Sequence, residues 1–242
     1  MQGQKLPFAL AIDLLFSILY NILMFKKITF FVLTFAFFIC VAFSQGIVTA
    51  NEYFAQVSEK YGTIKDYESS ANIIIGKREM RGRITYLSPN MMRIDFSEPA
   101  SQAIVFDGKK LVVYLPENAM LLTQDANSES LATSEGLSLM RRYYSVSYET
   151  SQTPVPLEEG SDEEVVRLML WRRTTSEAFR YIRLSINPNT KMIRRLEAVT
   201  PANVAYVFDF LSYEINQGLT EQRFKYDIPS AANTYDNFMF SQ

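Results

Sequence analysis

The stretch "LSPNMMRIDFSEPASQAIVFDGKKLVVYLP" occupies residues 87–116 and decides the fold class. Within it Met92, Ile94 and Phe96 alternate with Arg93 and Asp95. A period of two residues is typical of a strand with one apolar face. Prolines stand at both ends of this strand, where a missing backbone N–H does little harm. The stretch therefore predicts antiparallel strands that have one apolar face.

The Asp-Gly pair at 107–108 lies between two apolar runs. This dipeptide is among the strongest short hairpin patterns, because glycine tolerates a positive φ. Residues that pair across a hairpin share a face of the sheet. We therefore expect Ile104 and Phe106 to lie on the same face as Leu111 and Val113.

The same alternation recurs on both sides of this hairpin, at about 71–75 and 83–86 and again within "ANVAYVFDFLSYEI" (202–215). It predicts ten or eleven antiparallel strands, hence a mainly β protein. No repeat of 20–50 residues is present, which excludes a propeller or solenoid. The further apolar positions on the predicted inward face are Ile73, Ile75, Ile84, Tyr86, Tyr206, Phe208 and Phe210.

Two short helices interrupt the strand pattern. Residues 49–64 open with Thr49 and Glu52 at the spacing of a capping box and end at a glycine. A second helix is expected from about Ser134, which would cap it. A helix at this place is suited to form a lid over the sheet. Its apolar residues, the predicted lid residues, are Leu137, Met140 and Tyr144.

Residues 24–44 have the pattern of a secretory signal peptide. Two lysines precede an apolar run at 28–43, and small residues precede Gln45. The run is short for a membrane span, which needs roughly 20 residues. We therefore expect one exported domain at 45–242. The earlier apolar run at 1–23 has two interpretations: a start-site artefact, with translation beginning at Met24, or an additional membrane segment that anchors the protein.

The composition excludes several classes of function. The chain of 242 residues has no histidine and a single cysteine, so His-dependent catalysis, His-based zinc sites, Cys-rich metal sites and internal disulfides are excluded. A net charge of −2 gives no electrostatic basis for binding nucleic acid. The acidic residues at 158–164 lack the spacing of a calcium loop and are interpreted as a solvated loop. We expect neither an enzyme nor a cofactor.

The large apolar side chains on one sheet face leave two structures open. One is a β-sandwich with a solid core, and the other is a half-closed barrel whose interior holds an apolar ligand. The bulk of the inward residues slightly favours the second. The pattern alone does not decide between them.

Residues 82–124 resemble the central part of the LolA-type periplasmic lipoprotein carriers, and the tail to about residue 230 is compatible with that family. The residues that carry the resemblance are Gly82, Pro89, Arg93, Pro99, Asp107-Gly108-Lys109 and Tyr114-Leu115-Pro116.

The resemblance implies an unclosed antiparallel β half-barrel with a helical lid over a hydrophobic cavity. It implies a carrier, expected to be a monomer, that takes acylated lipoproteins from an inner-membrane lipoprotein-releasing transporter to an outer-membrane acceptor. Ser88 stands where family members often have an arginine that is tied to cargo release, which puts the release step in question. The same half-barrel also serves in periplasmic lipid-binding or lipoprotein-sensing modules, which remain the alternative.

Overall fold

A computed structural model describes residues 46–125 and 136–237. The chain divides into two compact units, Met1–Ile47 and Val48–Gln242, and nearly all described residues belong to the second. The predicted signal peptide, the segment before it and the predicted cap Ser134 lie outside the described residues and stay predictions. Among the described helices, none is both long and apolar enough to cross a membrane.

The described part of the second unit is mainly β, as predicted. Its one large sheet is unclosed, and the one parallel pair among the described strands is that of the last strand with β6. The strands are β1 (Asp66–Ile75), β2 (Arg78–Leu87), β3 (Met91–Glu98), β4 (Ala103–Phe106), β5 (Lys110–Leu115), β6 (Met120–Asp125), β7 (Tyr144–Tyr148), β8 (Val155–Pro156), β9 (Glu164–Arg172), β10 (Tyr181–Ile186), β11 (Ile193–Val199), β12 (Ala205–Phe210), β13 (Glu214–Ile215) and β14 (Asn233–Asp236).

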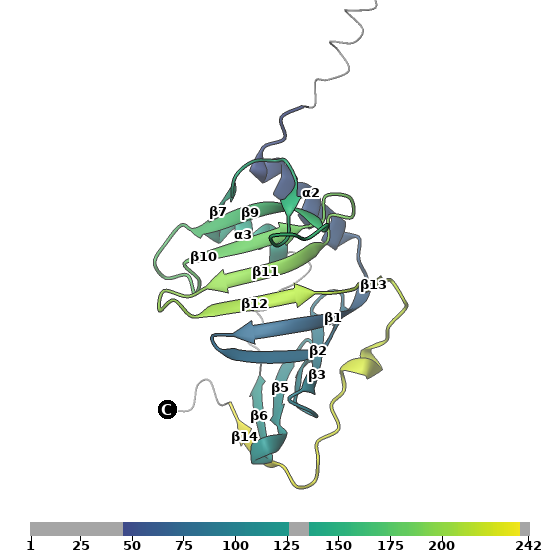
Figure 1. Cartoon of the computed structure of the whole chain (residues 1–242). Helices are drawn as coiled ribbons and strands as arrows, with labels where there is room; N and C mark the ends of the chain where they lie inside the picture. The colour runs from purple at the N-terminus through teal and green to yellow at the C-terminus, as the bar shows by residue number, and fades with distance from the viewer. Residues whose placement is uncertain (1–45, 126–135, 238–242) are drawn as a thin grey trace, which may run out of the picture. The chain divides into compact units, whose positions relative to one another are not determined.

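The strand order is β14-β6-β5-β4-β3-β2-β1-β12-β11-β10-β9-β7. Two meanders, β1–β6 and β9–β12, therefore meet where β1 pairs with β12 (Figure 1). The two-residue strands β8 and β13 pair with β9 and β1 beside this path. Without these two and the edge strand β14, the described sheet has eleven strands, in line with the predicted ten or eleven.

The hairpin β4–β5 forms at the predicted Asp-Gly pair. The Asp107 carboxylate accepts hydrogen bonds from the backbone N–H groups of Lys109 (2.8 Å) and Lys110 (2.7 Å), and Gly108 has φ +91°. Ile104 then pairs with Val113, and Phe106 with Leu111, so the predicted common face is confirmed.

One apolar face runs across the whole sheet, and we call it the inner face. Cross-strand pairing aligns Ile73 of β1 with Phe208 of β12, and Phe208 with Leu196 of β11. Leu196 pairs with Leu184 of β10, and Leu184 with Leu168 of β9. The period-two pattern of each strand therefore adds up to one continuous apolar surface.

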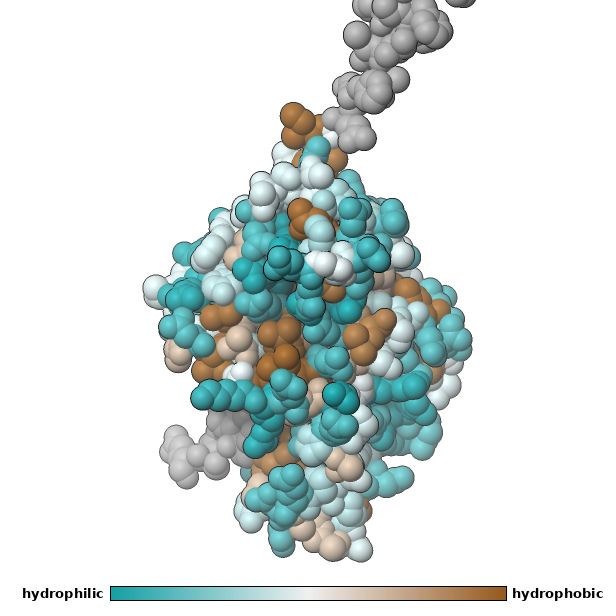
Figure 2. Space-filling view, in the orientation of Figure 1, coloured by the Kyte–Doolittle hydropathy of each residue, from teal (hydrophilic) through white to brown (hydrophobic). Residues whose placement is uncertain are grey.

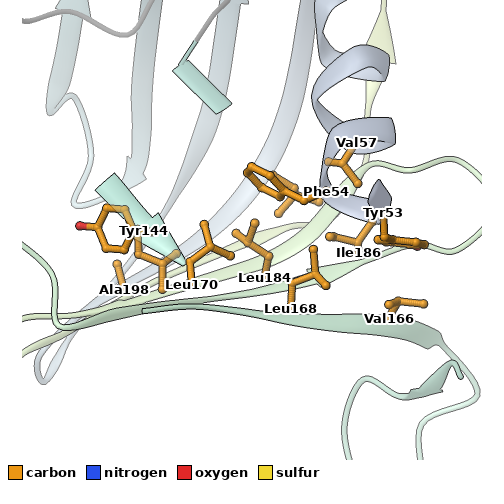
Figure 3. Packing of buried hydrophobic residues seen from close by; sticks show 12 residues of the cluster. Tyr53, Phe54, Val57, Tyr144, Val166, Leu168, Leu170, Leu184, Ile186 and Ala198 are labelled. Atoms are coloured by element: carbon orange, nitrogen blue, oxygen red, sulfur yellow. The ribbon is translucent and has the colours of Figure 1, made fainter. Parts of the chain in front are cut away.

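Helix α2 (Ala50–Gly62) covers part of the inner face. The predicted capping box is present: Glu52 N–H donates to Thr49 Oγ1 (3.2 Å), and Thr49 N–H donates to the Glu52 carboxylate (2.8 Å). Phe54 and Val57 are fully buried, and Figure 3 shows them on the helix, facing the leucines of the β9–β10 strands. This helix-covered cluster is the solid core of the domain.

Helix α3 (Gly136–Tyr143) packs against the same cluster through half-buried Leu137 and Met140. The prediction for Tyr144 was wrong: it is the first residue of β7, it is buried, and it belongs to the helix-covered cluster. A strand paired with β9 places this ring against the sheet itself.

The opposite, outer face of β3–β6 is covered by the C-terminal segment 216–236, which we call the strap. The strap includes a short 3₁₀ helix, η2 (Glu221–Phe224), and ends in β14 beside β6. Phe224 is buried, and Arg93 on β3 donates to the carbonyl oxygens of Arg223 (3.0 Å) and Lys225 (3.3 Å). A second short 3₁₀ helix, η1 (Pro116–Asn118), connects β5 and β6.

Candidate functional site

The inner face of β1–β4 and β12 carries an apolar hollow of about 340 Å³. In the sheet its lining strands are neighbours, in the order β4-β3-β2-β1-β12. We call it the apolar hollow. Its lining residues are Ile73, Ile75, Arg78, Met80, Ile94, Phe96, Gln102, Ile104 and Phe208.

The size of this hollow limits what it can hold. A water molecule occupies roughly 30 Å³ of liquid, and a methylene group is of similar size, so the hollow has room for about eleven methylene groups. The volume falls at the lower end of the roughly 300–1,000 Å³ of small-molecule sites. The hollow therefore fits one alkyl chain of moderate length.

Local backbone geometry positions the walls. The β2–β3 register shifts between Arg81 and Gly82, and Gly82 then pairs with Phe96. A Cβ atom at position 82 would lie 2.5 Å from the carbonyl oxygen of Asp95, so only glycine permits this close approach of the two strands. The glycine that carries part of the family resemblance thus sets the place of Phe96 in the wall.

Sequence alternation brings six of the predicted cavity residues together around the apolar hollow. They come from β1, β3 and β4, which are close in the sequence, and from β12, which is about 100 residues further along. These six residues are Ile73, Ile75, Ile94, Phe96, Ile104 and Phe208.

Other predicted cavity residues share the inner face but do not line the hollow. Ile84 and Tyr86 belong to the cluster that forms its walls. Phe106 is buried, whereas Met92 is 39% exposed, so this end of the face stays partly open to water. The remaining four are Leu111 and Val113, which are half-buried on β5, and Tyr206 and Phe210, which pack against the helix-covered cluster.

Arg78, Met80 and Gln102 line the hollow but were missed by the sequence reasoning. Met80 could have been found, because it continues the alternation of Ile84 and Tyr86 toward the N-terminal end of β2. Arg78 and Gln102 could not, because a polar residue on an apolar face interrupts the pattern used to find that face.

A second hollow, of about 630 Å³, lies beside the C-terminal end of α2 and the β10–β11 turn. Its lining is mixed rather than apolar: lysine, arginine, glutamate and asparagine side chains accompany an apolar floor. The lining residues are Lys60, Glu163, Asn187, Asn189, Thr190, Lys191, Met192, Ile193, Arg194, Phe210, Leu211, Ser212, Tyr213 and Ile215.

Two half-buried tyrosines, one of which lines the second hollow, are joined by hydrogen bonds. The Tyr61 and Tyr213 hydroxyls are 3.3 Å apart; Tyr61 accepts from Ile193 N–H (3.0 Å), and Tyr213 donates to the Ile193 carbonyl (2.8 Å). Burial raises the pKa of both phenols, so they stay neutral at ordinary pH. Their role here is to hold α2, β11 and the segment after β12 together.

Four of the five carboxylates of the acidic loop are exposed, as expected for a solvated loop, and two of the five also form ion pairs with the sheet. Glu158 forms an ion pair with Arg195 (2.6 Å), and Glu163 forms one with Arg194 (2.9 Å). Both arginines also contact Asp209, which is buried on β12. The loop is therefore fixed to the sheet by charge, and these arginines are structural.

The apolar hollow is suited to bury the hydrocarbon part of a ligand. Within residues 46–125 and 136–237, no cluster of acidic or thiol side chains could hold a metal ion. Figure 2 shows a surface that is largely hydrophilic, with hydrophobic residues gathered in separate patches. An unclosed sheet with an apolar hollow on its inner face defines a protein that binds an apolar ligand.

Comparison with known families agrees with this class. The family model described as Outer membrane lipoprotein carrier protein LolA matches residues 75–227, and the chain belongs to this family. The family is one of binding and carrier proteins rather than enzymes, and membership gives the chain a role in binding lipid or lipoprotein. A search of curated protein sequences gave no match.

Solved structures are similar to this chain at low sequence identity. An uncharacterized conserved protein from Thermus thermophilus is 16% identical with a TM-score of 0.52, and the match covers 77% of this chain and 98% of that one. A LolA superfamily protein from Nitrosomonas europaea is 13% identical (TM-score 0.36; 74% and 98% covered). MucB in the Pseudomonas aeruginosa MucA/MucB complex is 11% identical (TM-score 0.46), and the match spans 74% of this chain but only 61% of that one.

Proposed function

We propose that the protein is a periplasmic carrier that shields the acyl chains of lipoproteins and moves them from the inner to the outer membrane. The apolar hollow in a LolA-family domain is the single observation that carries the proposal. The donor would be an inner-membrane lipoprotein-releasing transporter, and the recipient an outer-membrane acceptor.

The energy of chain burial supports this function. Each buried methylene contributes about 0.8 kcal/mol, so about eleven of them contribute on the order of 9 kcal/mol. That is sufficient to keep one chain out of water during transfer. Three chains do not fit in 340 Å³, so a triacylated cargo requires the hollow to widen or the chains to extend along the inner face of β3–β5.

Partly open residues mark where such an extension would run. Met92 is 39% exposed on the inner face, and Leu111 and Val113 beside it are half-buried. Val113 continues the row of Ile94 and Ile104 in the hollow, and Met92 and Leu111 lie in the neighbouring row on either side of Phe106. Met92, Leu111 and Val113 would then contact the outer parts of the cargo chains.

The proposed compartment rests on the predicted signal peptide. N-terminal sequencing of the protein from cells should find a first residue within a few positions of Gln45. A product that retains residues 1–23 in the membrane would instead support the anchored form.

A lipid-binding or lipoprotein-sensing module is the second candidate. Ser88 favours it, because the family's release-linked arginine is missing there and the backbone of Ser88 is fixed by a hydrogen bond to the Lys65 carbonyl (2.7 Å). A transfer assay separates the two: a carrier passes a bound acylated lipoprotein to outer-membrane vesicles, whereas a sensor retains it.

The substitution Ile94→Glu tests binding at the hollow. Ile94 lines the hollow, so a carboxylate there can turn toward the opening; we expect the domain to fold and lipoprotein capture to fall at least tenfold. Ser97→Glu on the exposed, opposite side of the same strand is the control and should capture normally. Thermal melting and pull-down of acylated lipoprotein are measured on both. Normal capture by a folded Ile94→Glu variant would remove the hollow as the binding site.

A further inference from the structure

The apolar hollow has a single charged residue in its lining. Arg78 is the first residue of β2 and pairs with Ile75 across the β1–β2 hairpin. Its side chain is exposed and stands where the hollow meets solvent. The other lining residues are apolar except Gln102. A chain bound in the hollow would thus meet one cation at the mouth.

Arg78 differs from the other arginines of its strand. Arg81 pairs with Glu98 (3.5 Å), and Arg83 pairs with Glu68 (3.1 Å). Among the described residues, Arg78 has no ion pair, and no carboxylate lines the hollow. The strand thus neutralises the two arginines further along it and leaves unpaired the one that lines the hollow.

Gln102 adds a second polar group to the lining. It follows the turn after β3, and its backbone carbonyl accepts a hydrogen bond from Phe96 N–H (3.0 Å), which fixes this residue beside the wall. A glutamine side chain can donate through its NH₂ group. Guanidinium and amide donors together suit an oxygen-rich anion.

We propose that Arg78 binds the anionic end of a single-chain amphiphile whose alkyl chain fills the apolar hollow. The inference rests on the lipid-binding function and goes beyond the proposed lipoprotein cargo to a second ligand class: a chain of about ten to twelve carbons that ends in a carboxylate or a phosphate. Guanidinium binds either anion with two parallel hydrogen bonds. Anionic amphiphiles are therefore preferred over neutral ones of equal length.

The position at the mouth determines the size of the effect. An exposed ion pair contributes up to about 1 kcal/mol, and 1.4 kcal/mol corresponds to a factor of ten. We therefore expect a preference of about fivefold for the anion over the matched neutral chain. Because the pair is exposed, the preference should shrink as salt is raised.

The test compares dodecanoate, dodecyl phosphate and dodecanol, with the two anions below their micelle concentrations and the alcohol below its solubility limit. Displacement of the neutral dye Nile red from the purified mature domain reports binding. Wild type should bind both anions about fivefold more tightly than the alcohol. Arg78→Met should bind all three alike, and Arg78→Lys should retain most of the preference. Lys77→Gln removes the same charge one residue away, outside the hollow lining, and should behave as wild type.

The outcomes distinguish a failure of the lipid-binding function from a failure of head-group selection by Arg78. If none of the three compounds displaces the dye, the lipid-binding function itself fails. If all bind wild type equally, or if Arg78→Met keeps the preference, the hollow binds lipid but Arg78 does not select its head group, and the inference is overturned. A preference for only one of the two anions would assign the head group.

Discussion

The two halves of the sheet have the same sequence pattern but different interiors. Under α2, Leu168, Leu170 and Leu184 on β9 and β10 are fully buried against Phe54 (Figure 3). On β1–β4, the equivalent inner face borders a hollow, and its end at Met92 is exposed. Alternation determines which residues face inward. Whether they become core or binding surface depends on what covers them.

The largest expected effect comes from placing a glutamate, as in Ile94→Glu, in the half of the sheet that α2 covers. Leu184→Glu buries a carboxylate among packed leucines that leave no route to water. The cost should be on the order of 5 kcal/mol, which is comparable with the whole stability of many domains. Circular dichroism should show an unfolded or strongly destabilised protein, whereas Ile94→Glu stays folded. Equal melting temperatures for Leu184→Glu and Ile94→Glu would contradict the distinction between the covered half and the open half of the sheet.

The open half is stabilised from its outer face. Phe224 in the strap is 1% exposed, so Phe224→Ala should cost about 3–5 kcal/mol, measured by urea denaturation. Ile228 lies in the same strap but is 56% exposed, so Ile228→Ala should change stability by less than about 0.5 kcal/mol. If Phe224→Ala lost as little stability as Ile228→Ala, the strap would not stabilise the open half.

The smallest expected effect is a loss of stability at high pH in the covered half. Burial raises the pKa of Tyr53 to about 12, and within the described residues its hydroxyl has no hydrogen-bond partner. Because the folded-state pKa lies above the unfolded value of about 10, the stabilisation is complete below pH 10 and is lost as the pH rises toward 12.

Melting temperatures between pH 9 and 11.5 check this expectation. Tyr53→Phe should flatten the decline, and Tyr235→Phe, at an exposed position, is the matched control. A decline that Tyr53→Phe leaves unchanged would assign the effect to other groups, such as Tyr61 and Tyr213, whose pKa values burial also raises.

Local rules predicted much of the fold. The Asp-Gly hairpin, the shared face of Ile104 and Val113, and the Thr49–Glu52 capping box each depend on residues within a few positions of one another or directly paired, and each is present. The predicted cavity residues were found in the same way. The comparison of halves explains why only six of them line the hollow: period two defines a face, but long-range packing decides which part of it is covered.

The features that sequence reasoning missed depend on contacts between distant segments. Tyr144 looked helical because it lies seven residues after Leu137 and four after Met140, which is one face of a helix, but pairing of β7 with β9 extends the chain there. The strap was not predicted, because nothing in the sequence near Arg93 shows that its partners are the carbonyls of residues 223 and 225. Arg78 is exposed in a similar way to many surface arginines, and only the hollow distinguishes it.

The pairing of β1 with β12 has a consequence for the order of folding. During synthesis, β1–β6 emerge long before β12, the strand that completes the other side of β1. Until then β1 is an unpaired edge with Ile73 and Ile75 uncovered, a hazard for association with other chains. We expect a fragment ending before β12 to form the first meander and to aggregate, which light scattering of the fragment and the full domain would detect. Strand β12, which is synthesised late, thus protects the edge of β1 from association with other chains.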